Sequence, residues 1–306
     1  MHPHYPILPA LLLLVLLTAC QPAAATSAGG LNAIATTSIV ADVVQQIGGD
    51  AFTVSTLLPR GTDPHSFQPS PRDMAMVANA SIIFANGAGL EEFLQPLIEN
   101  AGTQARVVEV SDGIQLLEAP AEESDDGDVY TGDPHTWVDP NNVLVWVENI
   151  RAALVELDPS NAAIYQDNAE KYTARLKELD GWVTEQVALI PAANRILVTD
   201  HLVHGYFAAR YDFEQIGAII PGFSTSSSPS AQDLAQIEQA IRAHNVRAIF
   251  VSDSITPTLA QRVSDDTGVQ LVRLYHESFS VPGGPAATYL DMIHYNVNAM
   301  VAALKP

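Results

Sequence analysis

The chain has 306 residues, of which 47% are hydrophobic and 7% aromatic, and its formal net charge at pH 7 is −21. This composition is typical of a globular protein that holds one large domain or two of ordinary size. The strong negative charge excludes a nucleic-acid-binding protein, because a phosphate backbone requires basic patches. We expect most of the carboxylates to serve solubility.

The N-terminal segment is not expected to join the fold. Residues 7–17, ILPALLLLVLL, form an apolar run with the length of a signal-peptide core, which is too short for a membrane-spanning helix. The leading residues, MHPHYP, contain no Lys or Arg, unlike the usual basic start of a signal peptide. We predict a lipoprotein signal peptide over residues 1–19 and a flexible tether over residues 20–31.

Cys20 directly follows the apolar run and the small residues that end it. This order resembles a bacterial lipobox, in which the cysteine is lipidated and becomes the mature N-terminus. Cys20 is also the only cysteine of the sequence, so an intramolecular disulfide and a cysteine metal site are both excluded. A lone cysteine can also be a buried or free thiol, but its position after the apolar run favours a lipid anchor.

From residue 32 onward, short β-branched runs alternate with segments of helical apolar spacing. This alternation predicts parallel α/β sheets. In the first series, the predicted strands are residues 31–38, 52–59, 81–87 and 105–111, and the predicted helices are residues 39–50, 71–80 and 90–102.

An acidic stretch without histidine, EAPAEESDDGD, covers residues 118–128. It is predicted to be a solvated loop, and the alternative is a loop that collects cations through its carboxylates. Two helical segments follow, at residues 141–159 and 160–190, and Pro191 ends the second. An unbroken helix of about 30 residues would extend over about 45 Å, which is enough to run along two lobes.

A second α/β series follows this helix. Its predicted strands are residues 195–201, 214–220, 246–252 and 269–275, and its predicted helices are residues 202–213, 230–245, 256–268 and 286–304. We therefore predict two α/β lobes with parallel sheets, joined by one long rigid backbone helix. The predicted boundaries are residues 32–159 for the N-terminal lobe, 160–191 for the linking helix and 192–306 for the C-terminal lobe.

Two turns of the same design carry candidate ligands: TDPHSFQPSPRD at residues 62–73 and GDPHTWVDPNN at residues 132–142. The proline beside His65 and beside His135 restricts the backbone and helps to pre-organise a ligand. Asp63 and Asp133, two residues earlier, are expected to orient these turns, either as Asx-type caps or as acceptors for an imidazole N–H.

Two further candidates lie at strand ends. His201 ends the predicted strand at 195–201, and Glu277 lies two residues beyond the strand at 269–275. In open α/β sheets, ligands bind in the crevice outside the carboxyl ends of the strands. Two such edges that face each other across a cleft would bring His65, His135, His201 and Glu277 together.

Three neutral imidazoles and one carboxylate form a four-coordinate nitrogen and oxygen set that suits a divalent transition metal. A single histidine in a turn is more often a solvated or capping residue, but the repeated turn and the strand-end residues together favour a shared site. His276 is an alternative to Glu277 as the fourth ligand. His204 could face the same way as His201, but the HLVHGYF segment lacks the HExxH pattern of zinc proteases. His244 and His294 are expected to be structural or solvated.

Five ordered segments of the sequence resemble the zinc- and manganese-binding lipoproteins that serve as solute-binding proteins of ABC metal importers, some of which were first described as adhesins. The segments span residues 61–300: GTDPHSFQPSPRD, DPHTWVDP, VTDHLVHGYFAARYDF, PSAQDLAQI and TYLDMIHYNVNAM. The resemblance implies two lobes with a metal in the cleft between them. It also implies His65, His135, His201 and Glu277 as metal ligands, although Asp is the more usual fourth residue in that family.

The ligand types favour Zn²⁺ over Mn²⁺, because imidazole is the better ligand for zinc and carboxylate-rich sites suit manganese. Manganese remains the alternative, since the acidic loop contains no histidine. We expect a monomer, lipid-anchored outside the cytoplasm to a bacterial membrane, that captures the metal and delivers it to an ABC import permease. A rival of another class is an extracellular zinc hydrolase with Glu277 as general base, but no nucleophile or oxyanion motif accompanies it.

Overall fold

The structure is a computed structural model that describes residues 1–2, 31–118 and 132–306. The predicted signal peptide from residue 3 onward, Cys20, the predicted tether up to residue 30 and the acidic loop from residue 119 lie outside the described residues. Among the helices that the structure does describe, none combines the length and the apolar character needed to cross a membrane.

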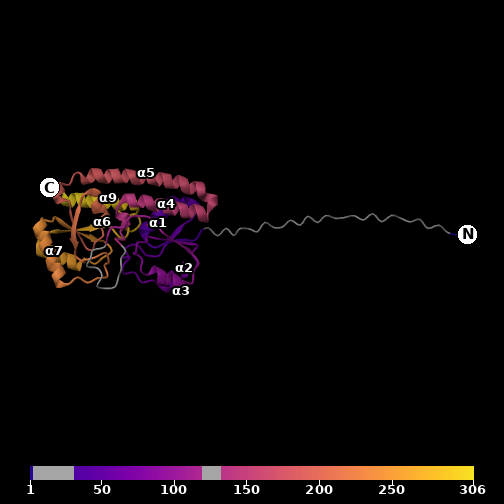
Figure 1. Cartoon of the computed structure of the whole chain (residues 1–306), viewed down its shortest axis with the longest axis horizontal. Helices are drawn as coiled ribbons and strands as arrows, with labels where there is room; N and C mark the ends of the chain where they lie inside the picture. The colour runs from indigo at the N-terminus through magenta and orange to yellow at the C-terminus, as the bar shows by residue number, and fades with distance from the viewer. Residues whose placement is uncertain (3–30, 119–131) are drawn as a thin grey trace.

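The N-terminal lobe is built on a parallel four-stranded sheet with the strand order β2-β1-β3-β4. Helix α1 covers one face of the sheet, and helices α2 and α3 lie on the other side (Figure 1). The elements are β1 (Ala33–Ala35), α1 (Ser38–Gly48), β2 (Val54–Thr56), α2 (Pro71–Ala78), β3 (Ile82–Ala85), α3 (Leu94–Ala101) and β4 (Arg106–Glu109).

The C-terminal lobe repeats this architecture, because its parallel sheet has the order β6-β5-β7-β8. The two predicted parallel sheets are confirmed, and the matching orders place β1 and β5 at equivalent positions. The elements are β5 (Ile196–Thr199), α6 (Gly205–Tyr211), β6 (Glu214–Ala218), α7 (Ala231–His244), β7 (Ala248–Ser252), α8 (Thr258–Thr267), β8 (Gln270–Leu274) and α9 (Tyr289–Leu304).

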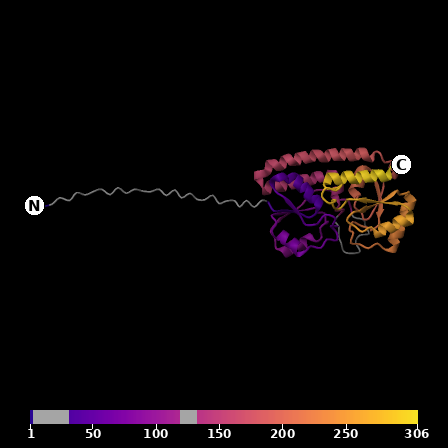
Figure 2. The same cartoon turned by 180° about the vertical axis from the view of Figure 1, so that it is seen from behind.

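A layer of helices joins the lobes. Helix α4 (Pro140–Leu157) packs against helix α5 (Ala162–Val187), and α5 continues along the molecule to contact α9 of the C-terminal lobe (Figures 1 and 2). The predicted long helix is therefore present, with 26 residues and a length of about 39 Å. It is shorter than predicted because a 3-10 turn at Pro159–Asn161 precedes it and it ends before the 3-10 turn at Ala192–Asn194.

Three buried clusters form the core. The largest runs beneath α1, α4, α5 and α9, and it contains residues from the central strands of both sheets. Two smaller clusters lie on the opposite faces, one in each lobe. Side chains alternate between these clusters along each strand: Ile34 lies in the N-terminal cluster, whereas its neighbours Ala33 and Ala35 lie in the shared one. Strands covered on both faces explain the continuous apolar runs of the sequence.

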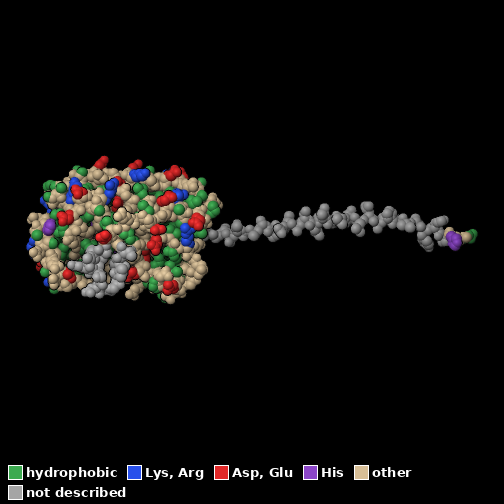
Figure 3. Space-filling view, viewed as in Figure 1, with side chains coloured by type: hydrophobic (Ala, Val, Ile, Leu, Met, Phe, Trp, Pro, Cys, Tyr) green, Lys and Arg blue, Asp and Glu red, His purple; other side chains and the backbone are tan. Residues whose placement is uncertain are grey.

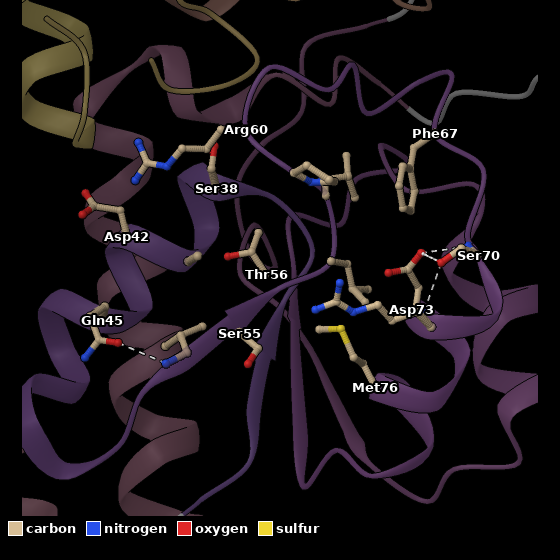
Figure 4. Close-up of a pocket in the computed structure, with 16 residues that line it drawn as sticks. Ser38, Asp42, Gln45, Ser55, Thr56, Arg60, Phe67, Ser70, Asp73 and Met76 are labelled. Carbon is tan, nitrogen blue, oxygen red and sulfur yellow. Dashed lines mark hydrogen bonds between the residues drawn. The ribbon is translucent and has the colours of Figure 1, made fainter. Parts of the chain in front are cut away.

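Equivalent helices of the two lobes begin in the same way. The Ser70 hydroxyl accepts a hydrogen bond from the backbone of Asp73 at the start of α2, and the Asp73 carboxylate accepts one from the backbone of Ser70 (Figure 4). Ser230 and Asp233 form the same capping box at the start of α7. On the face seen in Figure 3, Asp and Glu side chains are scattered over both lobes, as the net charge leads one to expect.

Candidate metal centre

The structure brings four predicted residues together between the lobes: His65, His135, His201 and Glu277. The His135 Nε2 atom lies 3.2 Å from Nε2 of His65 and 3.3 Å from Nε2 of His201. The Glu277 Oε1 atom lies 3.5 Å from Nε2 of His65 and 3.3 Å from Nε2 of His201. Three imidazole nitrogens and one carboxylate oxygen therefore converge on one point.

The spacing of these atoms matches the needs of a small metal ion. In a tetrahedral zinc site with bonds of about 2.0–2.1 Å, neighbouring ligand atoms are about 3.3 Å apart. Four of the six separations among these atoms are 3.2 to 3.5 Å, close to this value, and all four atoms lie within 4.8 Å of one another. The Glu277 Oε1 atom is buried and makes no hydrogen bond with the described residues, as expected for an atom that serves an ion.

Two carboxylates fix the imidazoles so that Nε2 faces the centre. The Nδ1–H of His135 donates to Oδ1 of Asp133 at 2.8 Å, and the Nδ1–H of His201 donates to Oδ1 of Asp200 at 2.9 Å. Because a carboxylate can only accept, each Nδ1 carries a hydrogen, and Nε2 is the ring atom that is left to face a metal. Asp133 was expected from the sequence, whereas Asp200 was not, although it directly precedes a candidate ligand.

Asp63 and Asp133 both accept from the backbone N–H of the histidine two residues later, but Asp63 makes no hydrogen bond to the imidazole. Its carboxylate accepts hydrogen bonds from the backbone N–H of His65 at 2.9 Å and from the hydroxyl of Ser66, also at 2.9 Å. The hydroxyl of Thr225, from the C-terminal lobe, donates to the same carboxylate at 2.6 Å. Asp63 therefore shapes the turn and ties it to the other lobe, while the Nδ1 atom of His65 has no hydrogen-bond partner among the described residues.

Burial governs the charge of the four residues. Burial lowers the pKa of His65 to about 4, against the attraction of Glu277, and it lowers the pKa of His135 well below the usual value. For His201 burial also acts downward, but Glu277 and Asp200 outweigh it and raise the pKa to about 10. For Glu277 burial acts upward, and His201 outweighs it and lowers the pKa to about 2. Without a metal, His201 and Glu277 thus form an ion pair, and a metal must displace the imidazole proton.

Aromatic residues hold the segment around His135 from the C-terminal lobe. The Trp137 Nε1–H donates to the backbone oxygen of His276 at 2.6 Å, and the Tyr289 hydroxyl donates to the backbone oxygen of Trp137 at 2.8 Å. The Tyr206 hydroxyl donates to the backbone oxygen of Asp133 at 2.7 Å. These buried bonds cross between the lobes and position the turn that the sequence predicted from its prolines.

Among the described residues, the histidines of the C-terminal lobe other than His201 do not join the four. His276, the predicted alternative to Glu277, points its Nε2 at Oδ1 of Asp200, 3.4 Å away. His204 directly precedes α6 without a capping hydrogen bond from its side chain, and its ring lies 5.2 Å from the ring of His276. His244 is exposed on α7, and the ring of His294 packs against Trp182 at 4.1 Å, as expected for structural or solvated residues.

A surface pocket of about 410 Å³ borders the centre, and His65 lines it together with Phe67, Glu92, Phe93 and Ser226. The His65 side chain itself is only 1% exposed, and the other three donors do not line this pocket. A second pocket, of about 730 Å³, lies among α1, β2 and α2, and none of the four donor residues lines it (Figure 4).

Comparison with known proteins agrees with this geometry. The family model described as zinc-uptake complex component A, periplasmic, matches residues 34–303. The manganese-binding lipoprotein MntA of Halalkalibacterium halodurans is 36% identical, with 90% of this chain and 89% of that protein covered. The iron-binding protein YfeA of Yersinia pestis is 33% identical, with 87% and 84% covered.

The solved structure of the periplasmic zinc-binding protein TroA of Treponema pallidum has a TM-score of 0.82 and 27% identity, and the similarity covers 90% of this chain and 99% of that one. These relatives are metal-binding components of transporters and not enzymes, which removes the hydrolase alternative. The chain belongs to the zinc-uptake complex component A family, the metal-binding solute-binding proteins of ABC transporters.

Proposed function

We propose that the protein captures one divalent transition-metal ion outside the cytoplasm, through His65, His135, His201 and Glu277, and delivers it to the permease of an ABC importer. The ion is the cargo of the protein. The observation that carries the proposal is the convergence of three Nε2 atoms and one carboxylate oxygen within 4.8 Å of one another, in a buried place between the lobes.

Zn²⁺ is the cargo that this donor set favours. Family membership does not decide the metal, because the names of the relatives include manganese, iron and zinc. Three imidazoles with one carboxylate suit Zn²⁺, whereas Mn²⁺ prefers oxygen ligands and more of them.

Calorimetry tests the proposal. Protein without its N-terminal segment is stripped with a chelator and titrated with Zn²⁺ and with Mn²⁺. We expect one tight site that prefers Zn²⁺ and is lost in His135→Ala, because the His135 imidazole is fully buried among the other donors. The matched control is His244→Ala, which removes an exposed histidine on α7 and should bind as the unaltered protein does.

The possible outcomes separate the parts of the proposal. Failure to bind either ion would refute metal capture. Tighter binding of Mn²⁺ than of Zn²⁺ would refute the zinc assignment and leave capture intact. Retention of the site in His135→Ala would refute the ligand set.

We also propose that Cys20 carries the lipid that holds the protein at a bacterial membrane. The support is the lipobox-like order of the sequence and the lipoprotein names of relatives. In bacterial cells that express the full chain, Cys20→Ala should move the protein from the membrane fraction to the soluble one, and mass spectrometry should find lipid on the N-terminal peptide of the unaltered protein. Light scattering tests the predicted monomer.

A further inference from the structure

The two carboxylate oxygens of Glu277 have different surroundings. Oε1 faces the Nε2 atoms of His65 and His201, at 3.5 and 3.3 Å, and makes no hydrogen bond with the described residues. Oε2 points away from the donor cluster and accepts a hydrogen bond of 2.9 Å from the hydroxyl of Ser254, in the loop after β7. The only close partners of Oε1 are thus imidazoles that would share the ion with it, whereas Oε2 is held by a residue outside the donor cluster.

The direction of this hydrogen bond is fixed by chemistry. A carboxylate has no hydrogen to give, so the single hydroxyl hydrogen of Ser254 goes to Glu277. The hydroxyl of Ser252, 2.6 Å away, must then donate to the Ser254 oxygen. The backbone N–H of Ser254 in turn donates to the Ser252 hydroxyl at 3.2 Å. Ser254 has no freedom to turn its hydrogen elsewhere without breaking a bond.

The same network reaches a second candidate ligand. The backbone N–H of Ser252 donates to Oδ2 of Asp200, and Oδ1 of Asp200 accepts from the His201 ring. The two donors of the C-terminal lobe, His201 and Glu277, are thus connected through the loop that follows β7. Their relative position is therefore fixed by residues of this lobe.

We propose that Ser254 is a positioning residue that determines metal selectivity, because it holds Glu277 to coordination through one oxygen. This inference rests on the proposed capture of a metal by the four residues. With Oε2 engaged, the protein offers four donors, which satisfies Zn²⁺. A free Oε2 could rotate in as a fifth, oxygen donor, which would favour Mn²⁺ because that ion prefers more oxygen ligands.

The test compares Ser254→Ala with two other variants. Ser254→Thr keeps a hydroxyl at the same position and should restore the selectivity of the unaltered protein. Ser264→Ala removes a buried hydroxyl of α8 that donates to the backbone of Val269, in the same lobe but outside the network, and controls for a general loss of packing. Zn²⁺ and Mn²⁺ affinities are measured by competition with chelators, and Co²⁺ is bound as an optical probe of coordination number.

In Ser254→Ala we expect the ratio of Zn²⁺ affinity to Mn²⁺ affinity to fall by about 10-fold or more, the scale typical of substitutions next to a metal ligand. We also expect the visible absorption of bound Co²⁺ to weaken, because four-coordinate Co²⁺ absorbs more strongly than five-coordinate Co²⁺. Equal loss of both affinities with an unchanged Co²⁺ spectrum would overturn the inference, and so would an unchanged affinity ratio. If the unaltered protein bound no metal, the proposed function itself would fail.

Discussion

The two lobes place a buried carboxylate at the same point of the same strand order, in the crevice between the two central strands. In the N-terminal lobe it is Glu91, which accepts from the Thr36 hydroxyl after β1 at 2.6 Å and from the backbone of Asn86 after β3 at 2.7 Å. In the C-terminal lobe it is Asp200, directly after β5, which accepts from the backbone of Ser252 at the end of β7. Each acid links the two central strands of its sheet, β1 with β3 or β5 with β7. The strand order reverses between these two strands, and ligands of open α/β sheets bind at this point.

What differs is the neighbour of each acid. Asp200 also accepts from the imidazole of His201, and although burial acts upward, the nearby histidines lower its pKa well below the usual range. Glu91 is bound by a hydroxyl and backbone N–H groups, and burial dominates and raises its pKa to about 7. At equivalent places in the two lobes, Asp200 therefore orients a metal ligand, whereas Glu91 only links the ends of the two central strands. Equivalent topology does not imply equivalent chemistry.

The largest expected effect concerns Glu91 and the pH dependence of stability. Its folded pKa of about 7 lies above the ordinary value of 4.5, so the folded state binds the proton more tightly than the unfolded state does. Ionisation of Glu91 therefore lowers the free energy of unfolding. This loss is absent well below pH 4.5, grows as the pH rises, and is complete above pH 7. From pH 5 to pH 8, the metal-free protein should lose about 2 to 3 kcal/mol of unfolding free energy that Glu91→Gln does not lose.

Chemical denaturation of both proteins at the two pH values measures this difference. Glu91→Gln can be less stable at every pH, because an amide cannot accept from all three donors. The readout is therefore the change with pH and not the absolute stability. Parallel profiles of the two proteins would contradict the raised pKa.

The second prediction sets Asp200 against Glu91 in metal binding. Asp200→Asn removes the carboxylate that fixes the His201 tautomer, and it should lower zinc affinity about 10- to 100-fold, which corresponds to about 1.4 to 2.7 kcal/mol. Glu91→Gln should leave zinc affinity almost unchanged. Competition with a chelator at fixed pH compares the two, and similar losses in both variants would show that the crevices are equivalent after all.

A third, smaller effect is expected at the contact between the lobes. The Arg60 guanidinium, in the N-terminal lobe, donates to the backbone oxygens of Ser280 and Ala287 at 2.8 and 3.0 Å and lies over the ring of Phe279. Arg60→Ala should cost about 1–2 kcal/mol of stability, since two carbonyl oxygens lose their partner. Arg72 provides the control. It lines the same 730 Å³ pocket as Arg60 but is exposed on α2, and Arg72→Ala should change stability by less than about 0.5 kcal/mol.

Zinc affinity of Arg60→Ala gives a second readout, because the segment held by Arg60 directly follows Glu277. We expect a loss of a few-fold, smaller than in Asp200→Asn. Thermal unfolding with and without zinc measures both effects. If Arg60→Ala and Arg72→Ala behaved alike, the hydrogen bonds of Arg60 would not stabilise the contact between the lobes.

The smallest effect, and an equal one in the two lobes, is expected at the matching helix starts. Ser70→Ala and Ser230→Ala each remove one side of a capping box and should cost about 1 kcal/mol. Neither should alter zinc affinity, since neither residue approaches the four donors. Denaturant midpoints test the pair, and a clearly unequal cost would show that the two helices depend differently on their caps.

Much of this could be predicted from the sequence, for identifiable reasons. The spacing of apolar residues depends only on neighbouring positions, so it predicted the strands and helices in their order along the chain. The repeated Asp-Pro-His turns indicated His65 and His135. Helix ends were less accurate: α6 begins at Gly205, so His204 lies before the helix and not within it. Local patterns do not define where a helix starts when no strong cap is present.

The supporting residues were not predicted, because their roles depend on contacts between distant parts of the chain. Asp200 acts on both His201 and the end of β7, and Ser254 acts on Glu277 across the space between β7 and β8. Arg60 reaches a segment more than 200 positions away. Their partners follow from the pairing of strands and the docking of the lobes, which the spacing of residues along the chain does not reveal.

The shared cluster beneath α5 has a thermodynamic consequence. One continuous core includes residues of β1 and β3 from one sheet and of β5 and β7 from the other, all covered by the same layer of helices. Exposing the inner face of either sheet would therefore expose apolar surface of the other half as well. Each lobe has its own sheet, but the two lobes share one core. The chain should therefore unfold in a single cooperative transition, and we do not expect either half to fold by itself.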